Sequence, residues 1–431
     1  MSLQAPTSTD ELGPDAQRLY APLRVAVALA AAAFFLWCAW GALRAGASRM
    51  VSVYAARAAV PDAADASIAL APSDPEAHYT RANLSADAGD HAGAARGYEA
   101  ALSLRPRDYV LWAELGKARE EAGDAEGALE AFRKAVALAP FYARPRWQLG
   151  NALLRAGRRE QAVEEMGRAA ESDPRLYPNL VETLWHAGGR DPRALARDAR
   201  PATAEQWLAV VRFLVKAGES REGLRLLRES GATLSAAARA RLVADLLAAE
   251  DFMGAHEVWA DGRKGARRGS FADGGFEGEA RTDEEGFGWR FLSGARGVKL
   301  SLDAESPREG ARSLLVEYAG ASEPAERAVS QLVPVEPGAR YRLTFAARTK
   351  NLVTGGPPVV EVFAASKAGA ALASTPALPN ATDGWRDFAL EFVAPAGGAV
   401  RVALRREPCA SSPCPAFGSV WLDAFELRRL G

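Results

Sequence analysis

The sequence predicts a multidomain α + β protein: a single transmembrane helix, an α-solenoid of helix pairs, and then an antiparallel β-sandwich. Three observations predict this order. An uncharged apolar run lies near the N-terminus, a repeat of 34 residues follows it, and the hydrophobic pattern changes to a period of two in the C-terminal part. With 431 residues, of which 48% are hydrophobic and 25% charged, the chain is long enough for two or three domains.

The apolar run covers residues 25–43 and follows an N-terminal tail of residues 1–24. As a helix, its 19 uncharged residues span roughly 28 Å, close to the thickness of a hydrocarbon core. Trp37 and Trp40 near one end suit an aromatic belt. A cleaved signal peptide is the alternative, with residues 45–47 (Ala-Gly-Ala) as the cleavage site. The length of the run and the acidic residues in the tail favour an uncleaved anchor.

The repeat is clearest in three frames, residues 75–108, 109–142 and 143–176. Six positions carry residues of the same kind in each frame, and each frame ends near a proline. These positions are Ala82, Gly116 and Gly150; Gly89, Gly123 and Gly157; Ala94, Ala128 and Ala162; Tyr98, Phe132 and Met166; Ala101, Ala135 and Ala169; and Pro106, Pro140 and Pro174. Each frame therefore predicts two short amphipathic helices that turn at the middle glycine and end before the proline.

These residues resemble the pattern of the tetratricopeptide repeat (TPR) family. The middle frame matches it best, through Trp112, Leu115, Gly116, Gly123, Ala128, Phe132, Ala135 and Pro140. The first frame departs from the pattern with His78 and Arg81. We expect a TPR-like domain over residues 50–262, with a degenerate half-repeat at its start and five or six helix pairs in all. One pair cannot bury its own apolar face, so neighbouring pairs stack.

The TPR resemblance implies a groove for a protein partner, lined by the first helix of each pair. Mapped by position, the groove residues are Tyr79, Asn83, Lys117, Glu121, Trp147, Asn151 and Arg155. The alternative is that these are ordinary solvated side chains. No basic cluster that would grip a carboxylate stands out among them, so the identity of the partner stays open.

Period-two alternation begins after residue 268, with Tyr341, Leu343 and Phe345 as the clearest example. Turn signals such as Pro337-Gly338 separate the apolar segments. Short strands with such turns predict an antiparallel sandwich over residues 268–431.

Six motifs in this region, FADGGFEGE, GFGWRF, REGARSLLVEY, VSQLVPVEPGARYRLTFAART, DGWRDFALEFVAP and SVWLDAFELRRL, stand in the order found in jelly-roll carbohydrate-binding modules. The resemblance is to the calcium-stabilised class of these modules and implies a polysaccharide partner. It further implies that Glu277 and Asp423 hold a structural calcium ion, the alternative being solvent-facing carboxylates at strand ends. No other cofactor is required.

Sugar sites use exposed aromatic faces and polar side chains. We take Trp289 and Tyr318 as glycan candidates, with Arg348 as a polar contact. Trp385 and Trp421 occupy strand positions where core packing is favoured.

Cys409 and Cys414 are five residues apart in a Pro- and Ser-rich loop. The spacing is compatible with a disulfide in an oxidising compartment, and two free thiols are the alternative. With the sandwich resemblance, a disulfide favours a C-terminus outside the membrane. The layout as a whole resembles single-pass proteins of a bacterial inner membrane, which implies that the C-terminal domains lie in the periplasm.

Other function classes receive less support. Basic and acidic residues number 53 and 54, so we expect no nucleic-acid partner. The four histidines, His78, His91, His186 and His256, have no metal-ligand spacing. Asp283, Glu284 and Glu285 would suit a glycosidase, but an acidic run beside glycine is more often a solvated loop. We expect no catalysis.

The predicted function is a membrane-anchored, non-catalytic adaptor that joins a protein partner to a glycan in surface polysaccharide assembly or export. The alternative is a protein-only scaffold whose sandwich binds no sugar.

Overall fold

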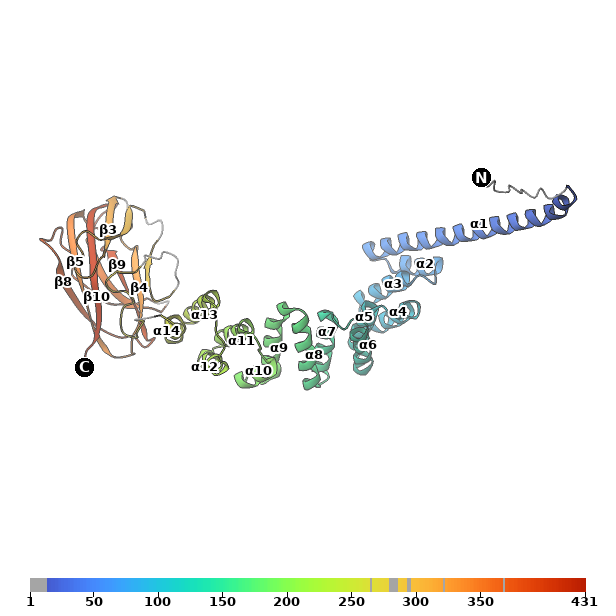
Figure 1. Cartoon of the computed structure of the whole chain (residues 1–431), viewed down its shortest axis with the longest axis horizontal. Helices are drawn as coiled ribbons and strands as arrows, with labels where there is room; N and C mark the ends of the chain where they lie inside the picture. The colour runs from blue at the N-terminus through green and yellow to red at the C-terminus, as the bar shows by residue number, and fades with distance from the viewer. Residues whose placement is uncertain (1–13, 264–265, 279–285, 293–295, 321, 367–368) are drawn as a thin grey trace, which may run out of the picture. The chain divides into compact units, whose positions relative to one another are not determined.

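The computed structural model describes residues 14–263, 266–278, 286–292, 296–320, 322–366 and 369–431. It confirms the predicted fold class, since helices fill the N-terminal part and two antiparallel sheets form the C-terminal part (Figure 1). The chain divides into two compact units, Met1–Leu180 and Val181–Gly431. Asp283, Glu284 and Glu285 lie outside the described residues.

The first unit consists of helices that pack against their neighbours in chain order. They are α1 (Pro14–Ala58), α2 (Pro61–Leu70), α3 (Pro75–Asp87), α4 (His91–Leu104), α5 (Tyr109–Glu121), α6 (Ala125–Leu138), α7 (Ala143–Arg155), α8 (Arg159–Ser172) and a 3₁₀ turn at Pro174–Leu176. The three repeat frames coincide with the pairs α3–α4, α5–α6 and α7–α8.

The repeated small residues allow the two helices of a pair to approach closely. A Cβ atom built on Gly116 of α5 would lie 2.8 Å from the Phe132 ring of α6, and one on Gly150 of α7 would lie 2.5 Å from the Met166 side chain of α8. Phe132 is buried and also packs against Leu149 of the next pair. Phe132 therefore holds together both its own pair and the neighbouring one.

Turns and caps recur at the same interval as the core. Gly89 and Gly123, between the helices of the first two pairs, have φ angles of 80° and 87°, which glycine adopts readily. Asp90 and Asp124 follow directly, and each carboxylate accepts the backbone N–H three residues later at 2.8 and 2.9 Å. Arg158 stands at the equivalent place in the third pair and provides no side-chain cap.

Helix α1 contains the predicted membrane segment and continues without interruption into the repeat region. Within Pro22–Ala58 a window of 18 residues has a mean hydropathy of 2.0, and this is the only helix among the described residues that is long and apolar enough to cross a membrane. Beyond the apolar run, the buried Ser48 hydroxyl donates to the Ser67 carbonyl of α2 at 2.8 Å. Ala55 is also fully buried, against Ala64. The second half of α1 thus takes the place of the first helix of a pair with α2.

The second unit begins with further helices, and the first of them, α9, spans the boundary between the two units. They are α9 (Tyr177–Ala187), α10 (Pro192–Ala199), α11 (Ala204–Lys216), α12 (Ser220–Ser230), α13 (Ala236–Ala248) and α14 (Phe252–Ala260). Trp259 of α14 packs against Phe287 of the sandwich, with ring centroids 5.6 Å apart. Leu332 and Ala399, on two sandwich strands, belong to the same buried cluster. The last helices and the sandwich therefore share a hydrophobic core within this unit.

Two five-stranded antiparallel sheets make up the sandwich. The strands are β1 (Trp289–Phe291), β2 (Val298–Asp303), β3 (Ser313–Gly320), β4 (Val329–Pro334), β5 (Arg340–Thr354), β6 (Pro358–Ala364), β7 (Ala371–Ser374), β8 (Arg386–Val393), β9 (Ala399–Arg406) and β10 (Ala416–Arg429). Sheet A has the order β1-β4-β9-β6-β7, and sheet B has the order β2-β3-β10-β5-β8.

The sandwich core is rich in aromatic rings. Phe276, Trp289, Phe345 and Phe425 pack together, with centroids of 4.7 Å between Phe276 and Trp289 and 4.9 Å between Phe345 and Phe425. Because side chains alternate along a strand, every second residue of each central strand faces this core and the next one faces outward. A binding site on the face of either sheet would therefore consist of the outward-facing residues.

Candidate functional site

The groove residues of the first repeat are partly used within the chain. Tyr79 and Asn83 lie on α3 and are half-buried. The hydroxyl of Tyr98 on α4 donates to Asn83 Oδ1 at 2.6 Å, and the rings of Tyr79 and Tyr98 are 6.0 Å apart. Burial, followed by the nearby carboxylate of Glu114, raises the pKa of Tyr98, so this hydroxyl stays protonated. This hydrogen bond holds the Asn83 side chain in one orientation. It does not involve the amide N–H₂ group of Asn83.

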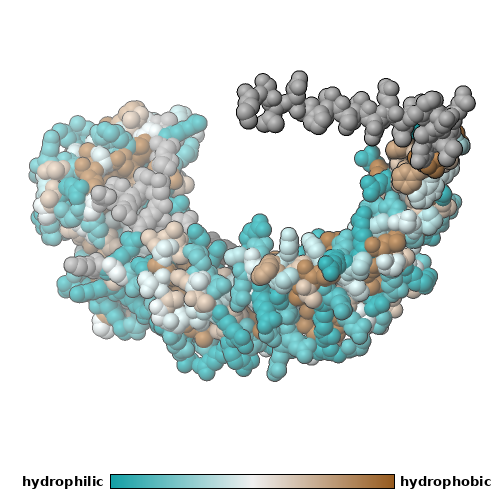
Figure 2. All heavy atoms as spheres, turned by 45° about the vertical axis from the view of Figure 1, so that its right-hand side comes forward, coloured by the Kyte–Doolittle hydropathy of each residue, from teal (hydrophilic) through white to brown (hydrophobic). Residues whose placement is uncertain are grey.

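The remaining groove residues differ in how free they are. Lys117 and Glu121 on α5 are exposed, and no ion pair or hydrogen bond of their side chains is described. Trp147 and Asn151 on α7 are half-buried. On the face in view in Figure 2, hydrophilic side chains make up most of the surface of the helical region.

Arg155 differs from these residues because its guanidinium already has a partner inside the chain. It is bidentate to the Glu120 carboxylate, with distances of 2.8 and 2.7 Å. The structure therefore brings α5 and α7 together through Arg155, while Lys117 and Glu121 stay available to a partner.

The two aromatic glycan candidates are not exposed. Trp289 is 8% exposed and its indole N–H donates to the Asp273 carbonyl at 2.8 Å. Tyr318 is 7% exposed and faces the core from β3, in line with Leu314 and Val316. The expectation of exposed aromatic faces at these two positions is wrong, because strand alternation directs both inward. Neither ring is free to stack on a sugar.

The expectation that Trp385 and Trp421 pack in the core is also wrong. Both are half-buried on the outer face of sheet B, since Val420 and Leu422 take the inward positions around Trp421. The guanidinium of Arg348 lies between them, 4.3 Å from the Trp421 ring centroid and 5.5 Å from that of Trp385. Such stacking stabilises a cation through the negative face of the aromatic ring.

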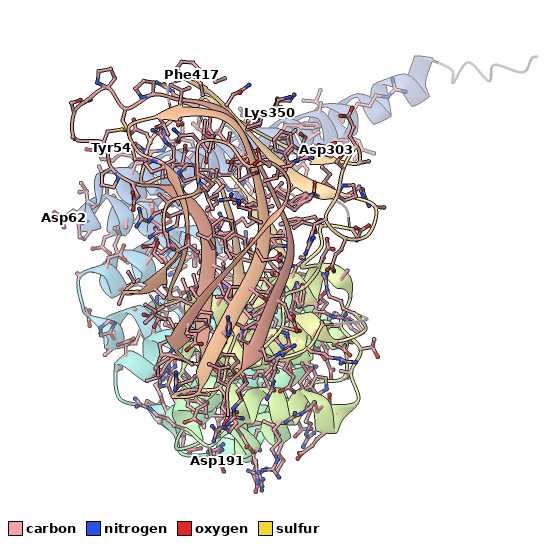
Figure 3. All side chains as sticks on the ribbon, turned by 90° about the vertical axis from the view of Figure 1, so that its left-hand side faces the viewer. Tyr54, Asp62, Asp191, Asp303, Lys350 and Phe417 are labelled. Carbon is pink, nitrogen blue, oxygen red and sulfur yellow. A yellow bond between two sulfur atoms is a disulfide. The ribbon has the colours of Figure 1, made fainter. Side chains whose placement is uncertain are left out.

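Asp303 completes this cluster on sheet B and is labelled in Figure 3. Its carboxylate accepts the Trp421 indole N–H at 2.5 Å and the Glu305 backbone N–H at 2.9 Å, and it lies 4.0 Å from Arg348. The Glu305 N–H first, then the Trp421 indole and the charge of Arg348, lower the pKa of Asp303. Arg348 is therefore both stacked and charge-balanced, and its role as a glycan contact stays a prediction.

The proposed calcium ligands do lie near each other. Asp423 is fully buried, and its carboxylate accepts the backbone N–H groups of Arg308, Glu309 and Ala424. Burial raises the pKa of Asp423, and the Glu277 carboxylate adds to this shift.

Glu277 Oε1 in turn accepts the N–H groups of Ala311 and Arg312 at 2.8 and 3.1 Å. Among the residues that the structure describes, no group of three or more His, Cys, Asp or Glu side chains could hold a metal ion. The two carboxylates bind the 308–312 loop through its N–H groups and do not by themselves make a calcium site. Calcium binding stays a prediction.

Cys409 and Cys414 form a disulfide. Next to it lies Arg406, which is 2% exposed and forms no ion pair with a carboxylate among the described residues. Its guanidinium donates to the Ser322 and Gly356 carbonyls at 2.8 and 3.0 Å and to Cys414 Sγ at 3.1 Å. Neutral acceptors thus satisfy this buried cation and fix the disulfide loop to the sheet.

A family model described as tetratricopeptide repeat matches residues 119–181. Among solved structures, "MamA 41-end from Desulfovibrio magneticus RS-1" is 23% identical over 36% of this chain and 90% of that one, with a TM-score of 0.32. A structure titled "CBM4 structure and function" is 13% identical over 37% of this chain and 100% of that one, with a TM-score of 0.28. No curated protein matches. At these TM-scores the two structural likenesses carry no argument about function.

Proposed function

We propose that this chain is a membrane-anchored, non-catalytic scaffold that binds a protein partner through its TPR groove and a glycan through its β-sandwich. The observation that carries the proposal is the stack of repeat pairs in which exposed Lys117 and Glu121 on α5 have no described partner. TPR stacks present such first-helix faces to other proteins, and residues 119–181 match the TPR family model.

The membrane part of the proposal rests on α1. Its apolar stretch is exposed throughout, with Phe35, Leu36 and Trp37 each 69–72% exposed. A soluble protein rarely displays such a continuous apolar surface, and a lipid environment would cover it. We place the anchor in a bacterial inner membrane with the C-terminal domains in the periplasm, where the Cys409–Cys414 disulfide would persist.

The partner groove is tested by photo-crosslinking in the native host. A photo-crosslinking amino acid replaces Lys117 or Trp147 in the groove, or the exposed Lys134 of α6 as a matched control on a second helix. We expect the two groove positions to crosslink to the same polypeptide and the control position not to do so. Equal crosslinking from Lys134 would show that the groove is not the binding surface.

The glycan role is tested with the full chain in detergent, because α14 shares the buried Trp259–Phe287–Leu332 cluster with the sandwich. Binding to a panel of bacterial polysaccharides is measured with calcium and with chelator. Retention of one glycan supports the adaptor. Retention of none by a folded protein supports the protein-only scaffold.

A further inference from the structure

The outer face of sheet A carries a hollow of about 450 Å³ that none of the sites above includes. It is lined by three arginines, Arg290, Arg327 and Arg401, together with Glu326, Ser330 and Phe363. Its volume falls within the range of small-ligand pockets.

Strand alternation and register explain why these residues meet. On β9, Val400 and Val402 face the core, so Arg401 between them faces outward. Phe363 on β6 is the direct cross-strand partner of Arg401. Arg290 on β1 is likewise paired with Ser330 on β4. Neighbouring strands thus place two arginines, a hydroxyl and a ring side by side on one surface.

The charges in this hollow do not cancel. The Glu361 carboxylate is 5% exposed and already pairs with Arg327 at 3.4 Å and with Arg405 at 3.0 Å. No ion pair or hydrogen bond is described for the side chains of Arg290 and Arg401. Glu326, the carboxylate in the lining, has no described ion pair with either of them.

Arg401 is the most constrained of the three arginines, because it is half-buried among like charges. Burial first, then the guanidinium groups of Arg290 and Arg327, lower the pKa of Arg401. A guanidinium remains charged nonetheless, and an anion bound in the hollow would offset the cost of this desolvation and repulsion. A planar carboxylate fits a guanidinium with two parallel hydrogen bonds.

We propose that this hollow binds the carboxylate of a uronic acid residue in an acidic polysaccharide. The inference rests on the glycan-binding role proposed above and specifies the class of glycan. Arg401 and Arg290 would hold the carboxylate, and the Ser330 hydroxyl would reach a ring hydroxyl. Leu292, which also lines the hollow and is 39% exposed, offers apolar contact to a face of the sugar ring.

The test compares two ligands with the same backbone, polygalacturonate and its fully methyl-esterified form. Binding to the full chain in detergent is measured by calorimetry at low and moderate salt. We expect the charged polymer to bind, the neutral ester to bind at least tenfold more weakly, and Arg401→Gln to weaken binding of the charged polymer by at least tenfold.

A matched control is Arg342→Gln, which removes an exposed arginine from the outer face of sheet B. It is expected to change affinity by less than twofold. The melting temperature provides a separate control on folding. Because Arg401→Gln removes a cation without a described partner, it is expected to leave the melting temperature unchanged or to raise it.

The inference would be overturned by equal binding of the charged and esterified polymers, by an equal loss with Arg342→Gln, or by binding of polyglutamate that is as tight and as sensitive to Arg401. Retention of a neutral glycan alone would overturn it while leaving the glycan-binding scaffold intact. Retention of no glycan by folded protein would remove both.

Discussion

Each outer face of the sandwich carries a half-buried arginine, but the groups that surround the two arginines differ. On sheet B, Arg348 lies between the Trp385 and Trp421 rings and near the Asp303 carboxylate. On sheet A, Arg401 is close to other arginines and has no described counter-charge. On the first face the chain itself supplies a carboxylate to the arginine, whereas on the second an anion from outside would take that role. This difference is the reason why we propose the outer face of sheet A, rather than that of sheet B, as the binding face.

Glu361→Gln should have the largest effect, because Glu361 supplies the described counter-charge on the outer face of sheet A. Its loss removes the carboxylate that Arg327 and Arg405 share, beside Arg401. Breaking a mostly buried ion pair of this kind costs roughly 2–4 kcal/mol. Hydrogen exchange of β6 and β9 measures the loss.

The same variant should bind polygalacturonate more tightly, because the hollow becomes more positive. Glu391→Gln, which removes an exposed partner of Arg340 on sheet B, is the control and should cost less than about 0.5 kcal/mol. Equal costs for the two variants would mean that the charges on sheet A are not coupled.

Trp421→Ala should have an intermediate effect and leave sugar binding unchanged. It removes the stack on Arg348 and the hydrogen bond to Asp303, which together contribute about 1–3 kcal/mol. Chemical unfolding of the sandwich measures this cost. Polygalacturonate affinity should stay within twofold of the unmodified chain. A large loss of affinity would move the glycan site to sheet B and reverse the comparison.

The smallest effect concerns pH and Asp303. Its folded pKa is lower than the unfolded value of about 3.9. The carboxylate therefore contributes stability that is fully present above the unfolded pKa and is lost as the pH falls through the folded pKa. Asp303→Asn should flatten the decline of the unfolding free energy below about pH 4. A decline as steep as that of the unmodified chain would assign it to other carboxylates.

The helical repeats could be predicted because their contacts are local and recur at a fixed interval. Gly116, Phe132 and Pro140 indicated a helix, its partner and its end. The aspartates at 90 and 124 share the same interval and would have located two helix N-termini as well. Which of the groove side chains are free could not be predicted, since the Arg155–Glu120 pair depends on how two repeats stack.

The strands of the sandwich were predictable, but the inward or outward direction of its tryptophans was not. Trp289 is inside because Phe276 and Phe425, from segments far apart, close around it. Trp421 is outside although its strand is central. Arg290 on β1, Arg327 just before β4 and Arg401 on β9 are remote in sequence, and the strand order β1-β4-β9 brings these segments together. Only tertiary pairing creates the hollow on sheet A.

The unbroken course of α1 has a mechanical consequence. The apolar run ends at Leu43, and Ser48 is already bonded to α2, only about 8 Å further along the axis of the helix. A spanning α1 therefore has no hinge at the bilayer surface, and the pair that it forms with α2 cannot rotate freely about the membrane anchor. Tilt of α1 in the lipid would therefore reorient this pair by the same angle.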